Sequence, residues 1–113
     1  MIAAFLALAG GAGLAFCQWL VYAWTPVEAT LGPIQKIFYM HLPLALWAMA
    51  SFFLVFLGSI LWLWQRKPAF DWLAAAAAEL GVLFSGLTLV SGMIWAKRSW
   101  GVWWTWDPRL TTA

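Results

Sequence analysis

The sequence predicts an all-α fold, a multi-pass bundle of transmembrane helices with three spans in this chain. Of the 113 residues, 65% are hydrophobic and 9% are charged, whereas ordinary soluble domains have roughly 25% charged residues. A helix needs about 20 residues to cross a bilayer. Three apolar runs are long enough: residues 2–24, 43–64 and 73–95. We therefore expect one membrane domain over residues 1–113.

The first run, residues 2–24, is predicted to be a retained helix. No basic residue precedes its apolar core. The run is also longer than the apolar region of a signal peptide, which usually has about 7–15 residues. Cys17 ends a stretch that resembles a lipoprotein cleavage box, but the bulky Phe16 stands where a small residue is wanted. The glycines of this helix would let another helix approach closely: Gly10, Gly11 and Gly13.

Proline positions predict where the later helices begin. The second span is expected to start at Pro43, with His41 just before it, because proline at the first helical position loses no bonded N–H. The Asp107–Pro108 pair predicts an N-cap and the start of a fourth helix over residues 108–113, which suggests that the chain is the front part of a longer protein. With three spans, the stretches 25–42 and 96–113 lie on the same side of the membrane.

The cations do not decide the orientation. Arg66 and Lys67 between the second and third spans favour a cytoplasmic location for that loop. The opposite side carries more cations: Lys36, Lys97, Arg98 and Arg109. Our hypothesis is that these four bind an anionic group, and the alternative for each one is an ordinary solvated loop charge.

Several classes of function are excluded. A net charge of +2 from scattered residues is too small for a nucleic-acid surface. The single cysteine, Cys17, can form no internal disulfide, and the chain has no C-x-x-C motif for thiol exchange. Nothing in the sequence indicates bond-making catalysis, so we do not expect an enzyme.

Tryptophan is concentrated in the segment WGVWWTWD, residues 100–107. Trp100, Trp103 and Trp104 have the i, i+3, i+4 spacing of one helical face, and Trp95 and Trp106 are close in sequence. Scattered tryptophans are typical of an aromatic belt at the membrane interface; here these are Trp19, Trp24, Trp62, Trp64 and Trp72. The dense cluster instead favours a stacking platform for a large flat ligand, because indole offers a broad apolar face.

His41 is the side chain best suited to coordinate iron, as a neutral imidazole. A lone histidine is more often a hydrogen-bonded interfacial residue, and the Trp-rich segment on the same side favours the ligand interpretation. Asp107 is interpreted mainly as a helix cap. For Glu79, inside the third span, we favour a protonated or hydrogen-bonded packing role over a proton relay. Hydroxyls on that span are expected to form interhelical hydrogen bonds: Ser85, Thr88 and Ser91.

Two motifs resemble one protein family. The segment WGVWWTWDPRLT, residues 100–111, is similar to the WWD signature of haem-handling proteins in cytochrome c biogenesis. Its ending resembles the haem exporter protein C family more than the sister branches, although Pro108 is shared with those. The segment IFYMHLP, residues 37–43, is similar to the family's histidine motif, and SGMIWAKRSWG, residues 91–101, to its approach to the signature.

The resemblance implies a protein of about six helices in the bacterial inner membrane, with the WWD segment (96–108) and His41 facing the periplasm. It implies haem b as transient cargo, passed to a periplasmic haem chaperone with help from ATP-binding transporter subunits. Membrane lipid would be the other partner, with no nucleic acid. His41 matches the first axial ligand of the haem iron, and the family's second axial histidine has no counterpart in this chain. The platform carried over consists of Trp100, Gly101, Trp103, Trp104, Trp106 and Asp107, with Arg109 beside it as a cation.

Two alternatives stay open. A haem lyase of the sister branch would attach haem to apocytochrome, and the Arg109–Leu110–Thr111 ending argues against it. A structural membrane subunit would use its tryptophans only as anchors.

Overall fold

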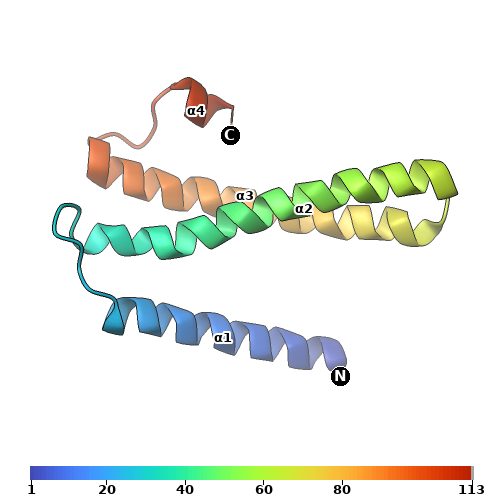
Figure 1. Cartoon of the computed structure of the whole chain (residues 1–113), viewed down its shortest axis with the longest axis horizontal. Helices are drawn as coiled ribbons and strands as arrows, with labels where there is room; N and C mark the ends of the chain where they lie inside the picture. The colour runs from blue at the N-terminus through green and yellow to red at the C-terminus, as the bar shows by residue number, and fades with distance from the viewer. Residues whose placement is uncertain (113) are drawn as a thin grey trace. The chain divides into compact units, whose positions relative to one another are not determined.

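The computed structural model describes residues 1–112, and their regular structure is helical (Figure 1). The elements in order are α1 (Ile2–Trp24), the 3₁₀ helix η1 (Pro33–Ile37), α2 (Phe38–Gln65), α3 (Pro68–Trp100) and α4 (Pro108–Thr111). Three helical segments are long and apolar enough to cross a membrane: Ile2–Trp24, Pro33–Gln65 and Pro68–Trp100. The predicted all-α, multi-pass membrane fold is confirmed.

The chain divides into two compact units, Met1–Met40 and His41–Ala113. In the first unit, Lys36 is buried and its Nζ donates a hydrogen bond of 2.9 Å to the backbone carbonyl of Tyr22, near the end of α1. The carboxylate of Glu28 accepts the backbone N–H groups of Leu31 and Thr30, and these two hydrogen bonds hold the pKa of Glu28 below its usual value. Both contacts order the segment that follows α1.

The α1 glycines have open space around them. A Cβ added at Gly10, Gly11 or Gly13 would meet no described atom within 4 Å. The close approach of another helix at these positions stays a prediction.

In the second unit, α2 and α3 form an antiparallel hairpin (Figure 1). A Cβ added at Gly58 would lie 3.1 Å from Ala74 Cβ, and one added at Gly92 would lie 3.2 Å from His41 Cε1. Since residue numbers rise along one helix as they fall along the other, the two helices run in opposite directions. The buried residues of this interface are all small: Ala48, Ser51 and Gly58 on α2, and Ala77, Gly81, Ser91 and Ala96 on α3. Small residues let transmembrane helix backbones approach closely.

The turn of the hairpin consists of Arg66 and Lys67. Arg66 has a φ of 53°, in the left-handed region, and its guanidinium lies 4.4 Å from the centre of the Trp62 ring. Pro68 then starts α3 at a position where the missing N–H costs no helical hydrogen bond. The hairpin therefore has its basic turn at one end and His41 at the other.

Two helix boundaries differ from the sequence-based prediction. The second span begins at Phe38, so Pro43 lies inside α2 and His41 lies in its first turn. The 3₁₀ helix η1 leads directly into α2. Because Pro43 has no backbone N–H, only the carbonyl of Tyr39, four residues earlier, lacks its helical hydrogen-bond donor. The third span covers Pro68–Trp100 rather than 73–95, because its ends are set by proline and glycine rather than by hydropathy.

Candidate ligand-binding site

His41 is held against α3 by Ser91 and Gly92. The Nδ1 atom of His41 lies 2.9 Å from Ser91 Oγ, and Ser91 Oγ donates to the Thr88 carbonyl at 3.0 Å. Gly92 lets the ring approach, since a Cβ there would lie 3.2 Å from His41 Cε1. The expectation that Ser91 forms an interhelical hydrogen bond is confirmed, and its partner is the candidate iron ligand.

The WWD segment leaves the helix at Gly101. Its φ of 78° is left-handed, and its N–H bonds the Lys97 carbonyl at 3.1 Å, which ends α3 at Trp100. Lys97 Nζ returns a hydrogen bond of 2.9 Å to the Gly101 carbonyl. The prediction that Trp100, Trp103 and Trp104 share one helical face is therefore wrong, because the left-handed glycine breaks the helical period between them.

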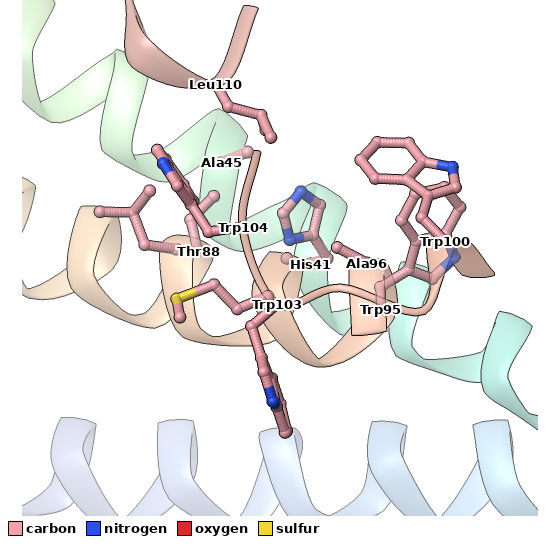
Figure 2. A pocket seen from close by; sticks show the side chains of 12 residues that line it. His41, Ala45, Thr88, Trp95, Ala96, Trp100, Trp103, Trp104 and Leu110 are labelled. Carbon is pink, nitrogen blue, oxygen red and sulfur yellow. The ribbon is translucent and has the colours of Figure 1, made fainter. Parts of the chain in front are cut away.

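The indoles form two edge-to-face pairs instead of one flat platform. The Trp95 and Trp100 rings lie 5.3 Å apart at 79°, and the Trp104 and Trp106 rings lie 6.0 Å apart at 82°. Figure 2 shows Trp104 on one side of the His41 imidazole and the Trp95–Trp100 pair on the other. The side chain of Trp103 points away from Trp104 and from the Trp95–Trp100 pair (Figure 2).

A pocket of about 340 Å³ opens beside the imidazole (Figure 2). Its lining residues are His41, Ala45, Thr88, Leu89, Gly92, Met93, Trp95, Ala96, Trp100, Trp103, Trp104 and Leu110. The volume lies within the roughly 300–1,000 Å³ of typical ligand pockets. The Thr88 hydroxyl oxygen is buried without a hydrogen-bond partner in the described part of the chain. The site is thus an apolar, aromatic pocket with an imidazole and one unpaired hydroxyl.

The structure brings together half of the sequence-predicted site residues. His41, Trp100, Trp103 and Trp104 line the pocket. The other four are not among the lining residues: Gly101, Trp106, Asp107 and Arg109. Gly101 shapes the segment through its left-handed backbone, and Trp106 packs on Trp104 while remaining 82% exposed.

Asp107 and Arg109 are paired with each other. The Asp107 carboxylate accepts Arg109 Nη2 at 3.0 Å and the Arg109 backbone N–H at 2.9 Å, which caps α4. These contacts, first the side-chain hydrogen bond and then the backbone one, hold the pKa of Asp107 below its usual value. The same side-chain hydrogen bond raises the pKa of Arg109. The N-cap prediction for Asp107 is confirmed, and the predicted fourth helix covers Pro108–Thr111; position 113 lies outside the described residues.

Three of the four cations proposed to bind an anion have partners within the chain. Lys36 bonds a carbonyl of the first unit, Lys97 bonds Gly101, and Arg109 bonds Asp107. Arg98 is exposed, and its guanidinium has no hydrogen bond or ion pair with residues 1–112. Glu79 is also exposed on α3, and its carboxyl group has no hydrogen bond to any residue described, so the expected hydrogen-bonding partner is not found there.

Gly92 and Ala45 also line the pocket, and the sequence holds a signal for both that was not used to predict the site. Thr88, Gly92 and Ala96 are spaced four residues apart on α3, and His41 and Ala45 have the same spacing on α2. Such spacing places side chains on one face of a helix, and small residues on that face permit a close helix–helix contact. Aligning these two helix faces would have placed Gly92 and its neighbours on α3 opposite His41.

The fold and the pocket define a multi-pass helical membrane protein with an aromatic, imidazole-containing site at one end of a helix hairpin. The family model described as Heme exporter protein C matches residues 1–113, and the chain belongs to this family.

Similar proteins carry the same name. Heme exporter protein C of Rhodobacter capsulatus is 36% identical over 91 residues, which cover 80% of this chain and 38% of the relative. The Escherichia coli K12 protein is 36% identical over 92 residues (80% and 37%), and the Haemophilus influenzae protein is 40% identical over 90 residues (79% and 36%). The chain thus matches about 38% of the length of its Rhodobacter relative.

Proposed function

We propose that this chain belongs to a membrane protein that binds haem b transiently as cargo during cytochrome c maturation. His41 is the proposed axial ligand of the haem iron, and the tryptophans around it form the surface against which the macrocycle packs. The protein moves haem and performs no bond-making step. The observation that carries the proposal is the imidazole of His41 between Trp104 and the Trp95–Trp100 pair in one pocket, in a chain of the Heme exporter protein C family.

The chemistry of the pocket fits haem. A neutral imidazole is a common axial ligand of haem iron, and indole rings pack well on a flat aromatic system. The Nδ1 atom of His41 is occupied by Ser91, whereas Nε2 has no hydrogen-bond partner in the described chain. Among residues 1–112 there is no group of three His, Cys, Asp or Glu side chains that could hold a bare metal ion. A single imidazole suits a metal whose other ligands come largely from the porphyrin.

We place the pocket on the periplasmic side of the bacterial inner membrane. The hairpin turn, with Arg66 and Lys67, lies at the end opposite His41, and the positive-inside tendency favours the cytoplasm for such a turn. The pocket end carries Lys97, Arg98 and Arg109, so the number of cations does not favour this orientation. The periplasmic placement of the site therefore rests on family membership.

The proposed partners follow from family membership. A periplasmic haem chaperone would receive the cargo, ATP-binding transporter subunits would assist, and lipid would surround the three spans. The second axial ligand of the iron is not assigned to any residue of this chain.

The test is a haemin titration of the detergent-purified chain followed by visible absorption. His41→Ala should lose most of the Soret change and bind haemin at least about tenfold more weakly, a difference of about 1.4 kcal/mol. Met40→Ala is the matched control, because Met40 is the preceding α2 residue and is not among the pocket-lining residues. Equal haemin binding by wild type and His41→Ala would contradict the proposal.

A further inference from the structure

We infer that Ser91 is a positioning residue for His41: its hydroxyl holds the imidazole in the form protonated on Nδ1, which leaves the Nε2 lone pair free for the iron. The inference rests on the proposed function, and it concerns the residue that prepares the ligand rather than the ligand itself.

The direction of the hydrogen bonds follows from counting protons. A serine hydroxyl has a single proton to donate and can also accept. Ser91 Oγ lies 3.0 Å from the Thr88 carbonyl oxygen, which can only accept, so the hydroxyl proton is directed there. The 2.9 Å contact with His41 is then a hydrogen bond only if Nδ1 donates to Ser91 Oγ. In a neutral imidazole one nitrogen carries the proton, so Nε2 is left unprotonated.

The position of the ring is determined from two sides. Ser91 is buried, with 7% of its surface exposed, and its hydroxyl is fixed to its own helix by the bond to Thr88. The adjacent Gly92 presents bare backbone to the ring, since even one added carbon would lie 3.2 Å from Cε1. The hydrogen bond therefore sets the protonation and rotation of the ring, while Gly92 sets its distance from α3.

Such support has known consequences for metal ligands. A histidine that binds a metal usually donates its other ring N–H to an acceptor, which fixes the tautomer and raises the basicity of the ligating nitrogen. Removing that acceptor typically lowers metal affinity by about 10- to 100-fold. Ser91 has the geometry of this acceptor.

The first experiment needs no haem. The chain contains one histidine, so ¹⁵N-histidine labelling of the detergent-solubilised chain reports His41 alone. At alkaline pH, where imidazole is neutral, the wild type should show a protonated Nδ1 and an unprotonated Nε2. Ser91→Ala should shift the spectrum toward the form protonated on Nε2, and Ser91→Thr, which keeps the hydroxyl, should restore the wild-type spectrum. A wild-type ring protonated on Nε2, or an unchanged spectrum in Ser91→Ala, overturns the inference.

Ser51→Ala is the matched control. Ser51 is buried at the same helix interface, at 5% exposure, but it lies ten residues after His41 on α2, about 15 Å along the helix axis. Its spectrum should equal that of the wild type. A shift as large as that of Ser91→Ala would show that loosening the interface alone changes the ring, and would overturn the specific role of Ser91.

The second experiment links the tautomer to haem. In a haemin titration, Ser91→Ala should bind about tenfold more weakly than the wild type, while Ser91→Thr and Ser51→Ala should stay close to it. If His41→Ala loses haemin binding but Ser91→Ala does not, the role of Ser91 is overturned and the proposed function stands. If His41→Ala binds like the wild type, the proposed function fails, and Ser91 then has no ligand to position.

Discussion

The Nδ1 atom of His41 and the Oγ atom of Ser91 lie 2.9 Å apart although 50 positions separate them in the sequence. The contact joins the first turn of α2 to the second half of α3, at the end of the hairpin where the WWD segment begins. It connects a candidate iron ligand to the helix that leads directly into the tryptophan cluster. Changes on α3 should therefore alter ligand binding without touching His41 itself.

The first prediction concerns Gly92→Ala. The added methyl carbon would lie 3.2 Å from His41 Cε1, so the ring must move. Overpacking of this kind costs about 1–3 kcal/mol, and we expect haemin affinity to fall about tenfold, measured by Soret titration. Gly86→Ala is the control, because its Cβ would meet no described atom within 4 Å on the same helix. Similar affinities for the two variants would argue against a tight ring position.

The second prediction concerns Trp104→Ala. Trp104 lines the pocket beside His41, and losing its indole removes both apolar area and an aromatic pair, which is worth about 0.5–1.5 kcal/mol beyond the area. We expect haemin binding to weaken about tenfold. Trp72→Ala is the control, because Trp72 lies at the other end of the hairpin and is 72% exposed. If the protein were a structural subunit whose tryptophans serve only as membrane anchors, the two variants would bind haemin equally.

The third prediction concerns pH and the Asp107 cap. Because its folded-state pKa is lowered by Arg109, the Asp107 carboxylate stabilises α4 fully above the reference value of 3.8 and loses this effect as pH falls through the lower folded-state pKa. The NMR signal of the Arg109 amide should thus stay constant from neutral pH to about 4 and change below it. Asp107→Ala should show the uncapped signal at every pH. A transition near neutral pH would refute this account.

The fourth prediction concerns Lys36 in the first unit. Lys36 is buried, and its Nζ donates to the Tyr22 carbonyl at 2.9 Å. A hydrogen bond to a charged group is worth about 1.5–3 kcal/mol, so Lys36→Met should loosen the segment after α1 and speed its cleavage in limited proteolysis with a protease that does not cut at lysine. Lys67→Met, at the exposed start of α3, is the control and should be cleaved like the wild type. Equal cleavage of all three proteins would show that the Lys36 bond does not order this segment.

Much of the fold could be predicted from local signals. Apolar runs longer than a bilayer crossing identify the three spans, and the Asp107–Pro108 pair identifies α4. Pro68 and Gly101 also mark the two ends of α3 in the sequence, but the prediction from hydropathy made this helix too short at both ends. These features depend on neighbouring residues only.

The candidate site was predictable as a set of residues but not as an arrangement. His41 and the tryptophans could be selected by their chemistry, whereas the split of the indoles into two pairs depends on the left-handed backbone of Gly101. The partner of His41 depends on how far α3 is shifted along α2. A shift of one helical turn, about 5.4 Å, would bring a different α3 residue opposite the imidazole.

The sequence by itself determined that this chain is a set of membrane-spanning helices with an imidazole and a tryptophan cluster on the same side, because hydropathy, helix caps and side-chain chemistry are local properties. The tertiary structure alone decided that Ser91 lies within hydrogen-bonding distance of His41 Nδ1 and that Gly92 lies against its ring. That pairing is set by the register of α2 against α3. The register in turn depends on the close packing of the small residues along the interface.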